Sequence, residues 1–492
     1  MYKLVGTIAG DVDLHQFTFT VLSGIRRNEY IQVWNELDGW ILGRVVSIVD
    51  VDKKTATVEI IGYKDERGFL MQPKCTLPRN NKVFKASQTF ISETLGLKSG
   101  GIYLGMLDGS NIQVHLKKEE LIQKHCSILA KTGSGKSYTA GVLIEELLEK
   151  NVPLLIIDPH GEYLTLKYEN RSEEERKQME KYGITPKGYA SKVVIYTPSN
   201  FSINPVADKL FRIDGINMSV SELYDLFPLT DAQLGILYQC INEIMLEKEF
   251  YTVEEIIKKV SESKSSAKWR IVHFLERIRE TGILSDSPTR IEELVKVNKA
   301  SIIDMKGANP KLQQLIVYRI CKEVFEGRKM GKIPPFMLVI EEAHNFCPER
   351  GFEKSVSSNI LRTIASEGRK FGLGLLIISQ RPARVDKNVI SQCNTQIILR
   401  VTNPNDIRAL SRGLEFMSSE MEEEIKRIPQ GVALLSSTSI EKPILVDIRV
   451  RRSEHGGRAV EMETEAIKER NKEARNVSEK EVKGGMLARL FI

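Results

Sequence analysis

The 492-residue sequence has no CxxC pair and no long apolar run. Its six cysteines are scattered, which argues against a zinc site and against a disulfide scaffold. No apolar segment reaches the roughly 18 to 20 residues that a membrane-spanning helix needs, and the first residues lack the apolar segment of a signal peptide. We therefore expect a cytoplasmic protein with no membrane partner.

The composition is that of an ordinary globular protein, with 41% hydrophobic and 28% charged residues. At this length, two to four folding units are expected. The net charge of +6 permits a polyanionic partner but does not require one, because a small excess of lysine is common on solvated surfaces.

The first 85 residues alternate apolar and polar residues in short runs, such as QFTFTVLS, EYIQVWN, GWILGRVVSIVDV and TATVEIIGY. Turn residues separate these runs at 38–39 and 52–54, which is the pattern of a small antiparallel barrel or sandwich. The proline-containing stretch at 71–84 is interpreted as a linker, and residues 101–116 as a further hairpin.

From about residue 120, short apolar runs alternate with helical patterns; the runs are CSILA, PLLIID, KVVIY, ASIIDM, FMLVIEEAH, GLLIISQ and TQIILRV. Because uninterrupted apolar runs indicate strands buried on both faces, we expect an α/β core with a parallel sheet. The resulting division is a barrel at 1–85, a core at 86–205 and 299–450, a helical insertion at 206–298 and a helical tail at 451–492. The tail ends in the apolar tip MLARLFI. This tip is interpreted either as a peptide that docks on a partner or as a segment that packs on a neighbouring subunit.

The segment AKTGSGKS, residues 130–137, lies at a predicted strand-to-helix junction and resembles a phosphate-binding loop. Backbone N–H groups of Gly133, Ser134 and Gly135 can point at a β-phosphate, and the helix N-terminus adds partial positive charge. Thr132 belongs to the same nucleotide-binding loop.

Two side chains at the end of this loop are expected to act on the nucleotide directly. Lys136 should bridge the β- and γ-phosphates of ATP, and the Ser137 hydroxyl should ligate Mg²⁺. Tyr138 follows them on the helix and is counted with the nucleotide-binding residues. Ala130 stands where the usual loop begins with glycine, which is tolerable if its φ stays negative.

The segment VIEEAHNF places two acids at the end of a predicted buried strand. We expect Glu341 to hold Mg²⁺ or its water and Glu342 to polarise the water that attacks the γ-phosphate. One of them is alternatively a helix N-terminal acid. Because two adjacent acids at a buried strand end are costly without a cation, the pair indicates hydrolysis and not binding alone.

The segment DPHGEY places Asp158 at the tip of another strand, where ligands bind in parallel sheets. Asp158 is expected to help organise Mg²⁺ or water, and Glu162 to orient neighbouring backbone. A simple turn accounts equally well for Pro159 and Gly161.

The segment SEGRKFGLGLLIISQRP carries three further candidates. Gln380 closes a buried strand, where its amide can sense the γ-phosphate. Arg369 precedes that strand, so we expect it to serve a neighbouring subunit's nucleotide as an arginine finger. Arg381 is the second candidate for this role, and a salt-bridged surface arginine is the alternative for Arg369.

Together with His125 ahead of the loop, these four segments resemble the HerA and FtsK superfamily of RecA-like P-loop ATPases, in particular the archaeal HerA DNA translocases. The resemblance covers nearly the whole chain and implies that the N-terminal domain is a HAS-barrel. It also makes Lys124 and the basic segment 449–452, including Arg451, candidates for touching a nucleotide at a subunit boundary. Ala130 departs from the usual loop, whereas Glu341 in place of the more common Asp agrees with HerA-type chains.

The resemblance further implies a homohexameric ring that threads double-stranded DNA and works in end resection with a nuclease of the NurA type. Arg350 and Lys354, in a loop after the acid pair, are candidates for DNA phosphate contacts. A protein-remodelling hexamer with Phe346 or Phe352 as its pore aromatic, a packaging or conjugation pump, and a non-motor interaction protein are the alternatives. The paired acids argue against the last of these.

Overall fold

The computed structural model describes residues 3–456, apart from 51–52, 221–222, 225–228, 353–354 and 415–416. The chain divides into two compact units. The first contains residues 1–150, 172–185 and 374–451, and the second contains 151–171, 186–373 and the chain from 452 onward. The expected C-terminal tail falls almost entirely outside the described residues. In the part of the chain that is described, no helix is both long and apolar enough to cross a membrane.

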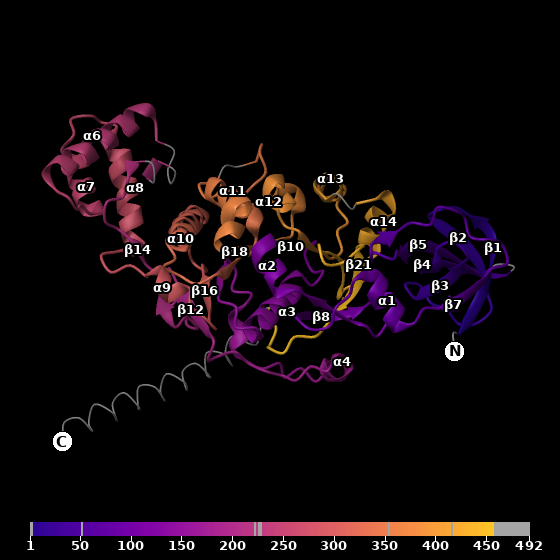
Figure 1. The fold of residues 1–492 in the computed structure, drawn as a ribbon. Helices are drawn as coiled ribbons and strands as arrows, with labels where there is room; N and C mark the ends of the chain where they lie inside the picture. The colour runs from indigo at the N-terminus through magenta and orange to yellow at the C-terminus, as the bar shows by residue number, and fades with distance from the viewer. Residues whose placement is uncertain are drawn as a thin grey trace, which may run out of the picture. The chain divides into compact units, whose positions relative to one another are not determined.

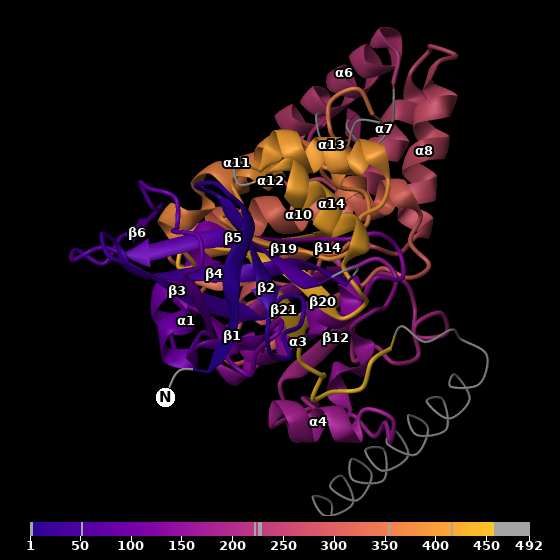
Figure 2. The same ribbon diagram turned by 90° about the vertical axis from the view of Figure 1, so that its right-hand side faces the viewer.

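The first unit begins with an antiparallel β-barrel, whose strands face the viewer in Figure 2. The strand order is β2-β1-β7-β3-β4-β5-β6, and pairing between β2 and β5 closes the barrel. Alternate residues, among them Phe17, Phe19 and Val58, form its core because successive side chains of a strand point to opposite faces. The strands are β1 (Leu4–Val12), β2 (Gln16–Val21), β3 (Tyr30–Asn35), β4 (Gly39–Asp50), β5 (Lys54–Lys64), β6 (Leu70–Met71) and β7 (Lys82–Lys85).

The barrel confirms the fold predicted for the N-terminal region, but the linker interpretation of 71–84 is wrong at its end. Residues from Lys82 form β7, which pairs with both β1 and β3. Val83 is fully buried in the barrel core. A four-residue strand that follows two prolines and two asparagines has too short an alternation to be recognised in the sequence.

The first unit also holds part of an α/β sheet. Strand β10 (Cys126–Leu129) lies between β18 (Leu373–Ser379) and β19 (Thr395–Ile398), all parallel. An antiparallel run continues from β19 through β20 (Val432–Ser436), β21 (Ile444–Ile448), β8 (Ile102–Leu107) and β9 (Gln113–Leu116). The helices are α1 (Gln88–Leu95), α2 (Lys118–Lys124), α3 (Lys136–Glu149), α4 (Arg176–Tyr182), α12 (Lys387–Ser391), α13 (Pro404–Gly413) and α14 (Ser419–Arg427). The predicted parallel strands and the predicted β8–β9 hairpin are therefore present.

The second unit is built on parallel strands in the order β13-β12-β16-β11-β17. These are β11 (Leu154–Asp158), β12 (Val193–Thr197), β13 (Lys209–Leu210), β16 (Ala300–Asp304) and β17 (Phe336–Ile340). Every residue of β11, β16 and β17 is buried, as the uninterrupted apolar runs predicted. Helices α9 (Ile291–Leu294), α10 (Pro310–Lys329) and α11 (Ser358–Glu367) belong to this unit.

A helical insertion interrupts the second unit, as predicted. Helices α6 (Asp231–Glu247), α7 (Val253–Glu262) and α8 (Lys268–Glu280) pack against one another, as seen in Figure 1. A capping box begins α6: the Thr230 hydroxyl accepts from the Gln233 N–H, and the Gln233 side chain accepts from the Thr230 N–H. At the base of the insertion, β14 (Ile213–Asp214) pairs with β15 (Leu284–Ser285).

Candidate active site

The loop between β10 and α3 has the conformation of a phosphate-binding loop. Gly133 has a φ of 77° and Gly135 a φ of 95°, a left-handed backbone that a side chain would strain. Between them Ser134 is buried, and its hydroxyl donates to the Lys131 carbonyl at 2.6 Å. The two glycines at 133 and 135 are therefore required by the turn itself.

Ala130 enters this loop as a fully buried residue. Its N–H donates to the Ser379 carbonyl at 3.2 Å, which ties the loop entrance to the end of β18. Its φ lies outside the positive region, so alanine fits where the usual loop has glycine.

Two residues that were assigned to the nucleotide separately, Thr132 and Gln380, are in contact at the loop. The Thr132 hydroxyl donates to Oε1 of Gln380, which follows directly after β18. Lys136 and Ser137 open α3, and Lys136 is 8% exposed. The amide predicted to sense the γ-phosphate is therefore in contact with the loop predicted to bind it.

A buried ion-pair cluster, formed by Arg449, Arg451, Glu145 and Glu146, fixes the helix that follows the loop. Arg449 lies 3.2 Å from Oε2 of Glu145 and 3.0 Å from Oε1 of Glu146. Arg451 lies 3.3 Å from Oε1 of Glu145. Both arginines are completely buried. Removing one member of such a cluster leaves an uncompensated buried charge, which costs about 3–5 kcal/mol.

Three residues predicted to touch nucleotide have partners within the first unit. The Arg451 guanidinium belongs to the buried cluster, and the Arg451 N–H donates to the Tyr138 hydroxyl at 2.9 Å. That hydroxyl donates to Glu175 at 3.1 Å. The Lys124 ammonium, at the end of α2, donates to the Thr438 hydroxyl at 3.1 Å. Nucleotide contact by these residues stays a prediction, and for Arg451 burial gives no support to it.

In the second unit, Asp158 closes the loop that follows its own strand. Its Oδ1 accepts from the N–H groups of His160 at 3.3 Å, Gly161 at 2.8 Å and Glu162 at 3.1 Å. Its Oδ2 accepts from the Tyr163 N–H at 3.0 Å. Burial raises the pKa of Asp158 to about 7 despite these donors. The geometry shows a loop-fixing role, whereas the predicted role with Mg²⁺ stays untested.

Glu341 follows β17 and is fully buried, as predicted for a strand-end acid. Its Oε2 accepts a hydrogen bond of 2.5 Å from the hydroxyl of Tyr163, which is equally buried. Burial, followed by the charge of Glu341, raises the pKa of Tyr163 well above its usual value. The hydroxyl therefore remains protonated and acts as the donor.

Glu342 adopts an unusual backbone conformation, with φ 50° and ψ 47°. A residue with a side chain pays about 1–2 kcal/mol for this left-handed geometry, and such outliers gather at functional sites. Glu342 is 5% exposed, and its Oε2 lies 3.2 Å from Nδ1 of His344. The turn thus directs the two adjacent acids to different partners. Sequence reasoning had assigned no role to Tyr163 or His344.

The remaining predicted residues are at the surface or outside the described residues. Arg369 precedes β18 and Arg381 follows it, and both are exposed. Arg350 is also exposed, and Lys354 lies outside the described residues. Phe346 is fully buried, which contradicts the suggestion that it lines a pore, whereas Phe352 is 48% exposed.

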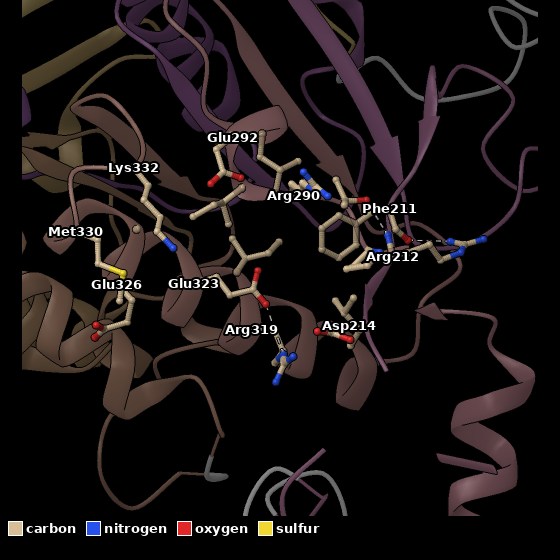
Figure 3. Close-up of a pocket in the computed structure, with 17 residues that line it drawn as sticks. Phe211, Arg212, Asp214, Arg290, Glu292, Arg319, Glu323, Glu326, Met330 and Lys332 are labelled. Atoms are coloured by element: carbon tan, nitrogen blue, oxygen red, sulfur yellow. Dashed lines mark hydrogen bonds and ion pairs between the residues drawn. The ribbon is translucent and has the colours of Figure 1, made fainter. Parts of the chain in front are cut away.

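A separate pocket of about 350 Å³ lies in the second unit, lined from β14, α9 and α10 (Figure 3). Charged side chains of both signs line the pocket, and among them Arg319 lies 3.7 Å from Glu323. The Arg212 side chain donates to the Pro198 carbonyl at 3.1 Å. The residues that line it include none of those predicted to act on nucleotide. The pocket is therefore not the predicted ATP site.

Residues 102–324 match the protein family described as Helicase HerA, central domain. The chain therefore carries a HerA-type central domain in this stretch and is similar to HerA proteins over most of its length. It is 27% identical to the probable DNA double-strand break repair helicase HerA of Methanocaldococcus jannaschii, over 92% of this chain and 97% of that protein. It is 26% identical to the DNA double-strand break repair helicase HerA of Pyrococcus furiosus, over 91% of this chain and 92% of that protein.

A solved structure agrees with this similarity at the level of fold. VirB4 of Thermoanaerobacter pseudethanolicus superposes with a TM-score of 0.52 at 18% identity, covering 72% of this chain and 97% of that one. The family resemblance, the P-loop fold and the ATPase activity expected from the sequence are therefore confirmed.

Proposed function

We propose that this protein is a DNA-translocating ATPase, in which ATP hydrolysis drives movement along double-stranded DNA. The observation that carries the proposal is the adjacent acid pair at the end of β17, in which one acid is held by Tyr163 and the other lies beside His344. A protein that only bound nucleotide would have no need of a second, strained acid. The two HerA relatives are named as DNA repair helicases, which supports DNA as the track.

Each group has a defined part in the proposed reaction. The N–H groups of the loop bind phosphate oxygens, and Lys136 stabilises the charge that develops on the transferring phosphoryl group. Glu342 accepts a proton from the attacking water. Gln380, already hydrogen-bonded to Thr132, reports whether the γ-phosphate is present.

Mg²⁺ fits the residues proposed to hold it. The fully buried carboxylate of Glu341 is of the oxygen type that Mg²⁺ prefers, and burial of that charge is favourable when a cation compensates it. The Ser137 hydroxyl is the second ligand we assign. When bound, Mg²⁺ neutralises phosphate charge.

The finer proposals rest on the family resemblance. We infer a homohexameric ring, with Arg369 supplied to the neighbouring subunit's ATP and Arg381 as the second candidate. We also infer DNA end resection with a nuclease of the NurA type. Exposed Arg350 is our candidate for a DNA phosphate contact, together with Lys354.

Two substitutions test the ATPase part of the proposal. Lys136→Ala should abolish hydrolysis, because the charge on the transferring group is then unmatched. Glu342→Gln should bind ATP normally but not turn it over. Near-native hydrolysis by Glu342→Gln would transfer the assignment of the water-activating acid to Glu341. Duplex DNA binding should be independent of sequence and weaken steeply with salt; a protein-remodelling motor would show neither behaviour.

A further inference from the structure

Tyr163 is a fully buried residue whose polar group meets a strand-end acid. It comes from the DPHGEY segment after β11, and its hydroxyl reaches Oε2 of Glu341, after β17, at 2.5 Å. Strands β11 and β17 are parallel neighbours, with Ile157 in register with Ile340. The Glu341 N–H also donates to the Ile157 carbonyl at 3.1 Å. The contact therefore joins the ends of two directly hydrogen-bonded strands.

The loop before Tyr163 is held in one conformation. Asp158 accepts four backbone N–H groups from residues 160–163, the last of which is that of Tyr163 itself. Gly161, at φ 77°, supplies the left-handed turn, and a Cβ there would lie 3.1 Å from Leu164. The backbone that carries the Tyr163 side chain is therefore fixed by Asp158.

We propose that Tyr163 is a positioning residue for ATP hydrolysis, which holds the Glu341 carboxylate in the orientation needed for Mg²⁺ or its water. Asp158 then acts one step further away, by fixing the loop that carries Tyr163. This assignment replaces the direct Mg²⁺ role expected of Asp158. It rests on the proposed function of Glu341.

The tyrosine hydroxyl suits this role because its acceptor, the Glu341 carboxylate, is a charged group. A hydrogen bond to a charged acceptor is short and about twice as strong as one between neutral groups. With one oxygen held, the Glu341 side chain loses rotational freedom before nucleotide arrives. Removing the partner that orients a metal ligand typically costs 10–100-fold in metal affinity or activity.

The test is Tyr163→Phe, which removes one oxygen atom and keeps the ring that fills the space. The matched control is Tyr196→Phe, a buried tyrosine of the same unit whose hydroxyl donates to the Glu293 carbonyl at 3.5 Å. Binding of a fluorescent ATP analogue is measured with Mg²⁺ and with EDTA, and the turnover number is measured separately. Thermal melting of each variant shows whether it is folded.

Tyr163→Phe should bind the analogue in EDTA as the native protein does, but lose about 10-fold or more of the Mg²⁺-dependent gain in affinity and of kcat. Tyr196→Phe should match the native protein in both. A native Mg²⁺ response in folded Tyr163→Phe overturns the proposal. So does an equal loss of binding with and without Mg²⁺, because it shows a general structural defect.

A double-mutant cycle with Glu341→Gln tests whether Tyr163 acts through Glu341. Glutamine keeps an oxygen that accepts from Tyr163 but has no charge for Mg²⁺. If Tyr163 acts through Glu341, the Mg²⁺ response of Glu341→Gln should not fall further when Tyr163→Phe is added. Additive losses refute the coupling. If instead Glu341→Gln alone keeps the native Mg²⁺ response, the proposed role of Glu341 is at fault.

Discussion

Nδ1 of His344 lies 3.2 Å from Oε2 of Glu342, two residues earlier in the same turn. Both side chains are largely buried, and Glu342 has the left-handed backbone described above. A ring nitrogen at this distance is close enough to act electrostatically on the carboxylate that we assign to water activation. The turn therefore places a second polar group beside the acid.

We predict that His344→Ala lowers kcat about 10-fold or more, with little change in the KM for ATP, because the Glu342 side chain loses the group that orients it. His344→Asn, whose amide nitrogen can occupy the place of Nδ1, should recover much of the rate. Steady-state ATPase kinetics of both variants decide the point. Equal rates for alanine and asparagine would show that the ring only fills space.

The buried cluster of Arg449, Arg451, Glu145 and Glu146 should matter for stability. Arg449→Met leaves the two acids without their main counter-charge and should lower the free energy of unfolding by about 3–5 kcal/mol. Exposed Arg369→Met removes the same charge from the surface and should change it by about 0.5 kcal/mol or less. Urea unfolding compares the two variants. Similar losses in both would contradict the assignment.

Asp304 should make stability depend on pH. Burial raises the pKa of this carboxyl to about 6, with nearby Lys306 opposing the shift, and Asp158 lies beside it in strand register. Because the native state then holds the proton more tightly than the unfolded chain, the free energy of unfolding falls as pH rises from about 4 to 6. The fall attributable to Asp304 is about 1–3 kcal/mol.

The Asp304→Asn variant should show a flatter dependence over this range. Part of the slope should remain, because burial also raises the pKa of Asp158, to about 7, with the same sign of effect. Unfolding free energies measured at several pH values provide the test. An unchanged slope in the variant would show that Asp304 does not bind the proton in question.

Much of the fold follows from local patterns in the sequence. Strands β11, β16 and β17 are uninterrupted apolar runs. The spacing of glycine, lysine and serine in AKTGSGKS is typical of a phosphate-binding loop. The antiparallel strands β20 and β21 were not predicted, because an apolar strand does not reveal its direction or neighbours. Strand β7 was missed because it is only four residues long.

The contacts of Glu341 and of the buried arginine–glutamate cluster could not be predicted, because they join residues far apart in the chain. Glu145 and Glu146 have the appearance of a solvated helix face until Arg449 is placed against them. Tyr163 has the appearance of a core residue until Glu341 is placed beside its hydroxyl. The predicted strand-end position of Asp158 is observed, its oxygens accept from the backbone of its own loop, and its role with Mg²⁺ stays a prediction.

The proposed arginine finger is tested by mixing two inactive proteins, Lys136→Ala and Arg369→Ala. If Arg369 serves a neighbouring subunit, random assembly creates some interfaces with an intact loop and an intact arginine, and part of the activity returns. Mixed assemblies that stay inactive would mean that Arg369 acts within its own subunit or that several intact sites are needed. Full activity of Arg369→Ala alone would favour Arg381.

The most direct measurement is the ATPase rate of the native protein with and without linear duplex DNA, at fixed salt, with Glu342→Gln as the background control. A DNA-translocating ATPase should hydrolyse ATP several-fold faster when duplex DNA is present, and Glu342→Gln should stay inactive in both conditions. An ATPase rate that is the same with and without DNA, in protein shown to bind DNA, would contradict the proposal that hydrolysis drives movement along it.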